Sequence, residues 1–584
     1  MHGRLFWERG YHYERIKVSK NKNILLGVLA LLPVVVWVMV ILNNSVDVPW
    51  YDDFDPFPDF LRQWINSASV SDHLRLLFQP NNEHRMVIGK LVTLAYYGIT
   101  GHLNFTFLQL AGACFTIGTL FFFWKSFKES KLNWWYFLPV PFLLFQLQYH
   151  LVFLWAICSL QHQPVIFFVS LSMLLLSRNR FGWALLAAVC ATYSMSNGIF
   201  VWVSGAVILI LRSNYKLLGI WCITGAAAIG FYFFGLTTQG NELSIAFFKQ
   251  YPHLSVLGFF AFLGGLFDFL PEKDIVTRSV LPVIMGLLSM IWIGIWLLTL
   301  IIPWLKKTIN QPKILPVFVN TFSVNEKGRK AFQEFLLGIL IFLLMNALII
   351  GLLRPRFGFF VMIVSNYKMY PALFLMITYL SFISSTVKIN LQRKVFQLAI
   401  VVSVLIWIIS YFTYLPVIQE RKKYLMVNGY NQEHNEYGLG HVPYSAGAKY
   451  VDIVMKEMVA MRIYRYPQET DKLVSEIKNI QKPVSADLNV SAKNLNGKIL
   501  IEDSDSKLDS DGGQYAFVRD KDQVYLFKLE QNKYSGKNIF RQYINGSHVE
   551  IPFSALKPGV YDLGIVKVNG EQVSGGILKS ITVP

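Results

Sequence analysis

Apolar runs of about 20 residues recur along the chain between residues 24 and 415, and polar or charged segments separate them. A helix of this length crosses the ~30 Å hydrocarbon core of a bilayer. The first run, Asn23–Leu42, is too long for a signal-peptide core and lacks a small-residue cleavage site after it, so we expect an uncleaved anchor. The pattern predicts a mainly α, polytopic membrane domain with eleven spans, at residues 23–42, 105–124, 134–150, 164–177, 181–196, 199–211, 217–236, 280–302, 334–353, 366–386 and 396–415.

Two further apolar segments, Met86–Ile99 and Val256–Leu270, are short for a full crossing. Counting either of them as a crossing would place basic loops on both sides of the membrane. We therefore expect interfacial or re-entrant helices, which are tolerated where protein or a wet cavity lines them. Their position beside the outer loop 44–85 is typical of a cavity at the membrane surface.

Lys and Arg gather in the connections between alternate spans, and this predicts the topology. Basic connections face the cytoplasm in multi-pass proteins, so the N-terminus should be cytoplasmic and the C-terminal region extracytoplasmic. We expect a protein of the bacterial cytoplasmic (inner) membrane. The basic segments are 1–23, 125–131, 178–180, 212–216, 306–330 and 388–394.

The composition becomes polar after residue 418, and the pattern changes twice more. Residues 419–482 are polar with helical spacing in 446–463, which predicts a helical connector. From residue 483 to residue 584, short alternating stretches separated by Gly, Asn and Asp predict an extracytoplasmic β-sandwich. The five predicted strands are 497–503, 514–520, 523–529, 548–553 and 559–568. The expected organisation is therefore a tail at 1–23, a transmembrane domain at 24–418, the connector and the sandwich.

Composition and charge agree with a membrane protein. The mean hydropathy is +0.41, and 54% of the residues are hydrophobic, which excludes an ordinary soluble protein. The formal charge of +18 follows the membrane topology, so we expect no nucleic-acid partner. All four cysteines fall inside apolar runs, which argues against a disulfide framework.

Acidic residues are scarce in this chain, yet seven of them lie within residues 47–85. Directly after the first span, Trp50-Tyr51-Asp52-Asp53 is followed by Asp55. A carboxylate pair at a membrane exit can act as a general base or hold a divalent ion. The alternative is that the acids cap an interfacial helix and the aromatics form an interfacial belt. We favour function for Asp52 and Asp53, because adjacent like charges gain little as caps, and the belt for the aromatics.

Three ionisable residues, Glu83, His84 and Arg85, lie at the start of an apolar segment, where such groups are costly unless paired or wet. They could orient an acceptor hydroxyl, donate to a phosphate or fix the two aspartates. A helix-capping Glu with a snorkelling Arg explains them equally well.

Positive charge on the outer face is uncommon, and it occurs here around Pro355. Arg354 and Arg356 form a rigid cationic pair that matches phosphate oxygens, and Lys368 begins the next helix on that side. Contact with lipid headgroups is the alternative. His162, at an expected outer turn, is a weaker candidate for substrate binding.

In this arrangement the chain resembles the GT-C class of membrane glycosyltransferases. It is more narrowly similar to bacterial membrane proteins of that type, which have an aromatic–acidic motif after the first helix, an Asn-Glu-His-Arg stretch and an Arg-rich outer loop. Here these motifs are residues 49–55, 82–85 and 354–356. The chain departs from the His-Pro-Pro-Leu-like pattern of protein mannosyltransferases and from the Trp-Trp-Asp pattern of oligosaccharyltransferases.

The resemblance implies transfer of a sugar from a polyprenyl-phosphate donor to an envelope glycan, lipid or other acceptor, with inversion. The reaction would take place on the outer face of the lipid bilayer, with Asp52 or Asp53 as the base. The residues expected to bind substrates there are Trp50, Tyr51, Asp55, Glu83, His84, Arg85, His162, Arg354, Arg356 and Lys368. A divalent cation, Mg or Mn, on the loop acids stays open. The chain has no P-loop, zinc spacing, GxSxG or dinucleotide fingerprint. A lipid-linked-sugar transporter and a non-catalytic envelope scaffold are the alternatives.

Overall fold

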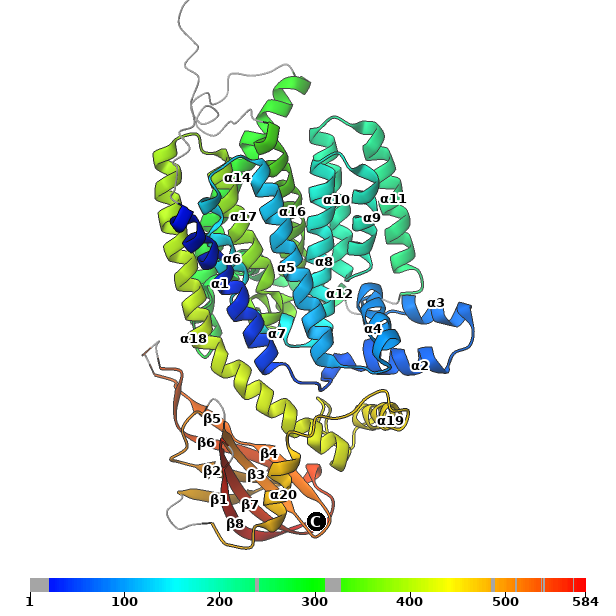
Figure 1. Cartoon of the computed structure of the whole chain (residues 1–584), viewed down its shortest axis with the longest axis vertical. Coiled ribbons are helices and arrows are strands. Elements are labelled where there is room, and N and C mark those ends of the chain that lie inside the picture. The colour runs from blue at the N-terminus through cyan, green and yellow to red at the C-terminus, as the bar shows by residue number, and fades with distance from the viewer. Residues whose placement is uncertain are drawn as a thin grey trace, which may run out of the picture.

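The computed structural model describes residues 20–236, 241–309, 327–484, 489–509, 512–536, 538, 541–570 and 572–584. The predicted N-terminal tail up to residue 19 and most of the predicted basic loop 306–330 lie outside the described residues. A helix bundle forms one part of the molecule, and a region of two β-sheets lies beyond one end of it (Figure 1). The helices of the bundle are α1 (Lys20–Asn44), α4 (Val87–Thr100), α5 (Phe105–Glu129), α6 (Pro139–Leu144), α7 (His150–Phe153), α8 (Ala156–Ser177), α9 (Phe181–Thr192), α10 (Phe200–Leu211), α11 (Tyr215–Phe233), α12 (Asn241–Gln250), α13 (Pro252–Leu263), α14 (Ile275–Ile309), α16 (Lys327–Leu353), α17 (Met369–Ser385) and α18 (Ile389–Asn435).

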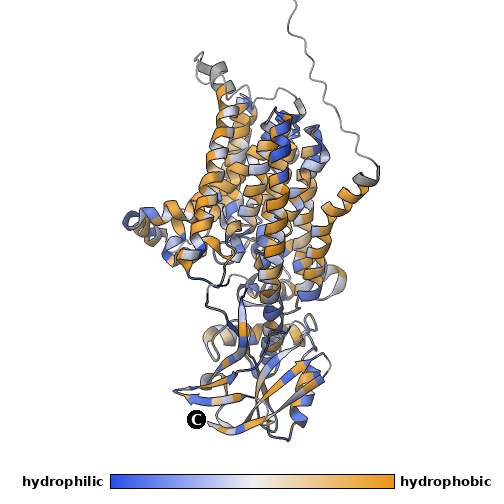
Figure 2. Cartoon of the chain, turned by 90° about the vertical axis from the view of Figure 1, so that its left-hand side faces the viewer, coloured by the Kyte–Doolittle hydropathy of each residue, from blue (hydrophilic) through white to orange (hydrophobic). Residues whose placement is uncertain are grey.

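Seven of the described helices are long and apolar enough to cross a membrane, and they begin at residues 24, 105, 156, 215, 275, 328 and 389. Six shorter apolar helices accompany them, at 87–100, 134–144, 181–192, 196–211, 252–263 and 369–385. Figure 2 shows hydrophobic residues along the length of the bundle and more polar ones towards its ends and in the β region. The chain is therefore built as a helical membrane protein.

Contacts between helix ends bring several of the basic connections to one end of the bundle, here called the basic end. The Arg178 guanidinium lies 2.5 Å from the Glu129 carboxylate, which joins the ends of α5 and α8. Arg212, after α10, pairs with Glu334 near the start of α16. Gln333 donates to the Ser385 hydroxyl at the end of α17, 3.1 Å away.

The opposite end, here called the β end, carries the acid-rich segment that follows α1. The helices α2 (Phe60–Asn66), α3 (Val70–Phe78) and α4 lie there with α19 (Ala446–Ala460) and the β region (Figure 1). Asp47 fixes this segment, since its carboxylate accepts hydrogen bonds from the Phe105 backbone N–H at 2.6 Å and the Asn104 amide at 2.7 Å. These bonds satisfy donors at the start of α5, which would otherwise lack partners.

One predicted span, 134–150, is interrupted in the structure. The chain forms the short helix η3 (Trp134–Phe137), then α6, a turn, and α7. Pro139 and Pro141 occupy the first turn of α6, where the missing N–H groups cost nothing. After α6 ends, Gln146 and Gln148 are buried, and Gln148 donates to the Leu266 carbonyl at 2.8 Å.

The change of composition at residue 419 does not end a helix, because α18 continues without a break to Asn435. Its last turns reach the β region, where the Asn431 amide donates to the Leu526 carbonyl and the Asn435 amide to the Val524 carbonyl. α19 and α20 (Asp471–Asn479) follow, as the helical spacing of the connector predicts for α19. The connector is thus bound to the sheets rather than a free linker.

The C-terminal region contains two four-stranded antiparallel sheets, with strand orders β1-β2-β6-β5 and β4-β3-β7-β8. Side chains from both sheets, among them Ile499, Ile551, Val518 and Leu563, share one hydrophobic cluster. The alternating stretches predicted five of the eight strands, and β1, β5 and β8 were not predicted. The strands are β1 (Val490–Leu495), β2 (Lys498–Asp503), β3 (Gly513–Arg519), β4 (Val524–Lys528), β5 (Glu530–Lys533), β6 (Tyr543–Pro552), β7 (Gly559–Asn569) and β8 (Gln572–Val583).

Candidate functional site

A cavity of about 630 Å³, here called the main cavity, opens among the helix ends at the β end of the bundle. Its size lies within the range typical of small-molecule sites. It is lined by residues from segments far apart in the chain, and the charged and polar ones are Asp52, Asn81, Asn82, Glu83, His84, Gln161, His162, Ser196, Asn197, Asn346, Arg354, Asn366, Tyr367 and Tyr370. The structure therefore brings together Asp52, Glu83, His84, His162 and Arg354 from the predicted site.

Asp52 lies in the short helix η1 (Tyr51–Asp53) and keeps an exposed side chain on the cavity wall. Partial removal from water raises the pKa of its carboxyl, the negative charge of Asp55 raises it further, and His441 lowers it. A carboxylate with a raised pKa is a stronger proton acceptor than a free one. Asp52 is therefore the acid of the predicted pair that is available to a ligand.

Asp53 points the other way and is buried. Its two carboxylate oxygens accept backbone N–H bonds, from Trp50 at 2.9 Å and from Ile157 at 2.8 Å. Ile157 is in the first turn of α8, so Asp53 satisfies a donor that the helix itself leaves unpaired. Burial raises the pKa of this carboxyl to about 7, against the lowering by its hydrogen bonds and by Arg421. The structure gives Asp53 the capping role and leaves the cavity to Asp52.

The side chains of the predicted Asn-Glu-His-Arg stretch also point in two directions, some into the main cavity and one into the protein. Asn81 and His84 form a tight turn through two backbone hydrogen bonds of 2.7 and 2.8 Å, which presents Glu83 and His84 to the main cavity. Arg85 turns into the protein, where its guanidinium donates to the backbone carbonyls of Phe78, Tyr232 and Phe234. Arg85 joins the acid-rich segment to the end of α11 and does not line the main cavity.

His84 is a neutral side chain at neutral pH. Burial lowers its pKa to about 4, and the positive charge of Arg354 lowers it further. Its Nδ1 atom is buried and has no hydrogen-bond partner. A neutral imidazole with an unpaired nitrogen can bind a hydroxyl group without competing with Arg354 for an anion.

Arg354 follows α16 directly and lines the main cavity. Within the described residues its guanidinium forms no hydrogen bond or ion pair, and the centroid of the Phe357 ring is 5.8 Å away. The Arg356 guanidinium stacks closer to the same ring, at 4.4 Å, and Arg356 does not line the cavity. Of the two predicted arginines, Arg354 is the one placed to meet a cavity ligand.

Lys368 is also outside the main cavity, because the protein already pairs it. Its ammonium group lies 2.8 Å from the Asp268 carboxylate and donates to the Tyr414 hydroxyl at 2.9 Å. Arg278 pairs with the same carboxylate at 2.7 Å. These contacts form a buried ionic group at the start of α17, here called the closed cluster (Asp268, Arg278 and Lys368).

A buried polar network forms another part of the cavity wall. The His162 Nδ1 atom lies 2.8 Å from the Tyr370 hydroxyl, and the Asn197 amide donates to this hydroxyl and to the Asn346 side chain, both at 2.7 Å. The side-chain oxygens of Asn197 and Asn366 are buried without hydrogen-bond partners. Neither Asn346 nor Tyr370 stands out in the sequence, since single polar residues inside apolar runs are usually paired within the protein.

The remaining predicted residues surround the cavity without lining it. Trp50 lies between Arg421, 4.2 Å from its ring, and Trp155, whose indole donates to the Trp50 carbonyl. Tyr51 packs near His441, and Asp55 accepts a hydrogen bond from the Tyr450 hydroxyl at 2.9 Å. Residues of the C-terminal connector thus cover the outer side of the aromatic–acidic motif.

A divalent-cation site does not fit the predicted acids. Both oxygens of Asp53 already accept backbone bonds inside the protein. Across the described part of the chain, no three His, Cys, Asp or Glu side chains are grouped to hold a metal ion.

Together, the main cavity offers a carboxylate with a raised pKa, a guanidinium, a neutral imidazole and two unpaired amide oxygens. This set can accept a proton, bind an anion and recognise hydroxyl groups. Comparisons with models of protein families, with curated proteins and with solved structures found no match for the chain.

Proposed function

We propose that the chain is a membrane glycosyltransferase of GT-C type, which moves a sugar from a polyprenyl-phosphate donor to an acceptor on the outer face of the cytoplasmic membrane. The observation that carries the proposal is that Asp52 and Arg354, about 300 residues apart in the sequence, line one cavity. A base and a phosphate-binding cation are the two groups that a single-displacement transfer requires.

The proposed topology has eleven crossings and places the main cavity outside. The seven long helices and the shorter ones at 134–144, 181–192, 196–211 and 369–385 account for these crossings, and those at 87–100 and 252–263 lie at the interface. Cytoplasmic placement of the basic end follows the rule that basic loops stay inside. The two packed sheets then form an extracytoplasmic β-sandwich of the kind found on many outer-surface proteins.

In this proposal Asp52 is the general base. An acceptor hydroxyl bound beside Asp52 gives its proton to the carboxylate while its oxygen attacks C1 of the donor sugar. A positioned general base contributes ~10²–10⁴-fold to such a step. Because the nucleophile is the acceptor itself, one base is sufficient and the configuration at C1 inverts.

In this proposal Arg354 binds the leaving group, which is the polyprenyl phosphate. As the acceptor attacks, the bond between C1 and the phosphate oxygen breaks, and its electron pair stays on that oxygen. A guanidinium is permanently charged and matches phosphate oxygens in two parallel hydrogen bonds, so Arg354 stabilises the charge that develops there. The neutral state of His84 and the unpaired oxygens of Asn197 and Asn366 suit the sugar hydroxyls between the two charges.

A single assay separates this proposal from transport and from a scaffold role. The full chain in lipid nanodiscs is incubated with radiolabelled polyprenyl-phosphate sugar and with extracted envelope acceptors. The proposal expects label in the acceptor and release of one polyprenyl phosphate for each sugar transferred. Movement of intact donor across vesicles without release of polyprenyl phosphate would indicate a transporter. If neither transfer nor movement occurs, the chain would be a scaffold.

A further inference from the structure

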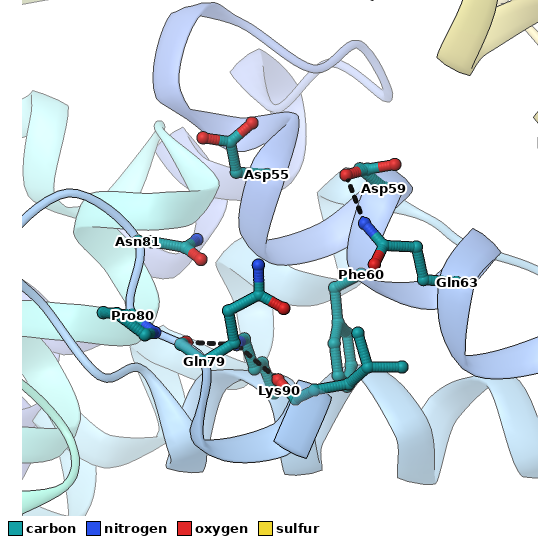
Figure 3. A pocket seen from close by; sticks show the side chains of 9 residues that line it. Asp55, Asp59, Phe60, Gln63, Gln79, Pro80, Asn81 and Lys90 are labelled. Atoms are coloured by element: carbon teal, nitrogen blue, oxygen red, sulfur yellow. Dashed lines mark hydrogen bonds between the residues drawn. The ribbon is translucent and has the colours of Figure 1, made fainter. Parts of the chain in front are cut away.

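A second cavity of about 240 Å³ lies beside the main cavity, between the acid-rich segment, α3 and α4. Asn81 lines both cavities, so the two hollows are neighbours. Figure 3 shows the carboxylates of Asp55 and Asp59 and the amides of Gln63, Gln79 and Asn81 gathered around the second one. Its volume is equivalent to about eight water molecules at ~30 Å³ each, which suits one small ring.

One donor in this cavity has no hydrogen-bond partner among the residues that the structure describes. The Asn81 side chain is 8% exposed, and its Nδ2 atom forms no hydrogen bond. The backbone of Asn81 is fixed by its two bonds with His84, so the amide is held in place. A buried donor left unpaired destabilises the protein, and a ligand oxygen would recover that free energy.

The charges around the second cavity exclude an anion. Asp55 and Asp59 face it, and Asp59 already accepts hydrogen bonds from Arg62 and Gln63, both at 2.7 Å. Among its described lining residues the one cation, Lys90, donates to the backbone carbonyls of Leu76 and Gln79, both at 2.8 Å, and lies over the Phe60 ring. The ammonium group is therefore already occupied. The Asp55 carboxylate and the amides of Gln79 and Asn81, without an available cation beside them, match the hydroxyl groups of an uncharged sugar, which both donate and accept.

We propose that the second cavity binds an uncharged saccharide ring, and that this ring belongs to the acceptor of the transfer reaction. The assignment of this ring to the acceptor rests on the proposed function. The negative charge of Asp55 acts on Asp52, so the acceptor ring would lie next to the base that activates its hydroxyl. The acceptor class is then a neutral glycan rather than a phosphate-bearing polymer.

The test measures sugar binding without turnover, by saturation-transfer NMR on the full chain in nanodiscs. The probes are methyl glucoside, galactoside and mannoside, with methyl glucuronide and inorganic phosphate as the anionic comparisons. At least one uncharged glycoside is expected to bind. Two substitutions, Gln79→Leu and Asn81→Leu, should each weaken the binding of that glycoside about threefold to tenfold, as expected for the loss of one hydrogen bond. Gln79→Leu alters the second cavity alone.

Gln468→Leu is the matched control, because Gln468 is exposed on the connector and far along the chain from both cavities. Asp52→Asn should keep glycoside binding, which separates this site from catalysis. No binding by any uncharged glycoside, unchanged binding in both cavity variants, or equal binding of glucuronide would overturn the proposal. Binding that depends on Gln79 in a protein without transfer activity would sustain the saccharide site and defeat the proposed function instead.

Discussion

Two groups of ionisable side chains lie at the same end of the bundle and differ in how far the protein supplies their partners. In the closed cluster, Asp268 pairs with both Lys368 and Arg278 and is fully buried. In the open group, Asp52, His84 and Arg354, no member forms a side-chain hydrogen bond or ion pair with another described residue, and all three line the main cavity. The closed cluster holds α14, α17 and α18 together, and the open group leaves its hydrogen-bonding capacity to a ligand.

This difference separates residues that look alike in the sequence. Asp52 and Asp53 are neighbours, yet one is on the cavity wall and the other caps α8. Arg354 and Lys368 were both predicted to bind phosphate, yet Lys368 is occupied by Asp268 and Tyr414. The predictions below test whether the open group acts on substrate and the closed cluster on stability.

The largest effect is expected for Asp52→Asn. The amide keeps the shape of the side chain and cannot accept the proton, so the transfer rate should fall ~10²–10⁴-fold without a change in the thermal unfolding midpoint. The measurement is the release of polyprenyl phosphate by purified protein. Asp72→Asn, the same change at a half-exposed acid in α3, is the control; wild-type transfer in Asp52→Asn would remove Asp52 from the mechanism.

The next largest effect is on stability and belongs to Lys368→Met. Removal of one partner leaves part of a buried carboxylate charge uncompensated, which costs about 3 kcal/mol. Thermal unfolding in detergent should show a clear fall in the midpoint, whereas Lys449→Met, at an exposed site in α19, should show none. An unchanged midpoint together with lost donor binding would mean that Lys368 serves the substrate after all.

Arg354→Gln is the counterpart in the open group. Loss of one charge-assisted contact to phosphate costs about 1.5–3 kcal/mol, which corresponds to a tenfold or larger fall in kcat/KM for the donor. The unfolding midpoint should stay within the error of the wild type, because no partner in the described residues loses a bond. Arg75→Gln, on the exposed face of α3, is the matched control, and equal kinetics in both variants would contradict the phosphate role.

The smallest effect is a pH dependence of stability that comes from Asp53. Its pKa rises from 3.8 to about 7 on folding, so between these values the folded state keeps a proton that the unfolded state has lost. Stability from this group is complete below pH 3.8 and is lost as pH rises through about 7. Asp47 has the same shift, so Asp53→Asn should flatten the fall in the unfolding midpoint between pH 5 and pH 8 only in part.

Much of the architecture follows from the sequence because hydrophobic length and loop charge are local properties. The predicted helices at 105–124 and 334–353 lie within α5 and α16, and the strands at 497–503 and 559–568 match β2 and β7 closely. The break inside 134–150 was missed, because it depends on buried partners such as the Leu266 carbonyl for Gln148. The eleven crossings, the orientation and the sandwich remain predictions.

The site was predictable only at the level of its segments. The sequence pointed to 49–55, 82–85 and 354–356, and one or more residues of each line the main cavity. The sequence could not show that Asp52 lines the cavity while Asp53 is buried, or that Glu83 and His84 line it while Arg85 does not. The positions of Asp53 and Arg85 depend on backbone groups of α8 and α11, which lie far along the chain. Asn346 and Tyr370 were missed for the same reason, since their hydrogen bonds to Asn197 exist only in the folded bundle.

The most direct test of the central claim is an electron cryomicroscopy structure of the full chain with a polyprenyl-phosphate sugar whose glycosidic oxygen is replaced by carbon. The account predicts phosphate density within hydrogen-bonding distance of the Arg354 guanidinium and the sugar C1 facing Asp52 across the main cavity. Phosphate bound elsewhere, for example in the apolar cavity of about 1060 Å³ between α1 and α5 near Lys128 and Lys131, with the main cavity empty, would contradict it.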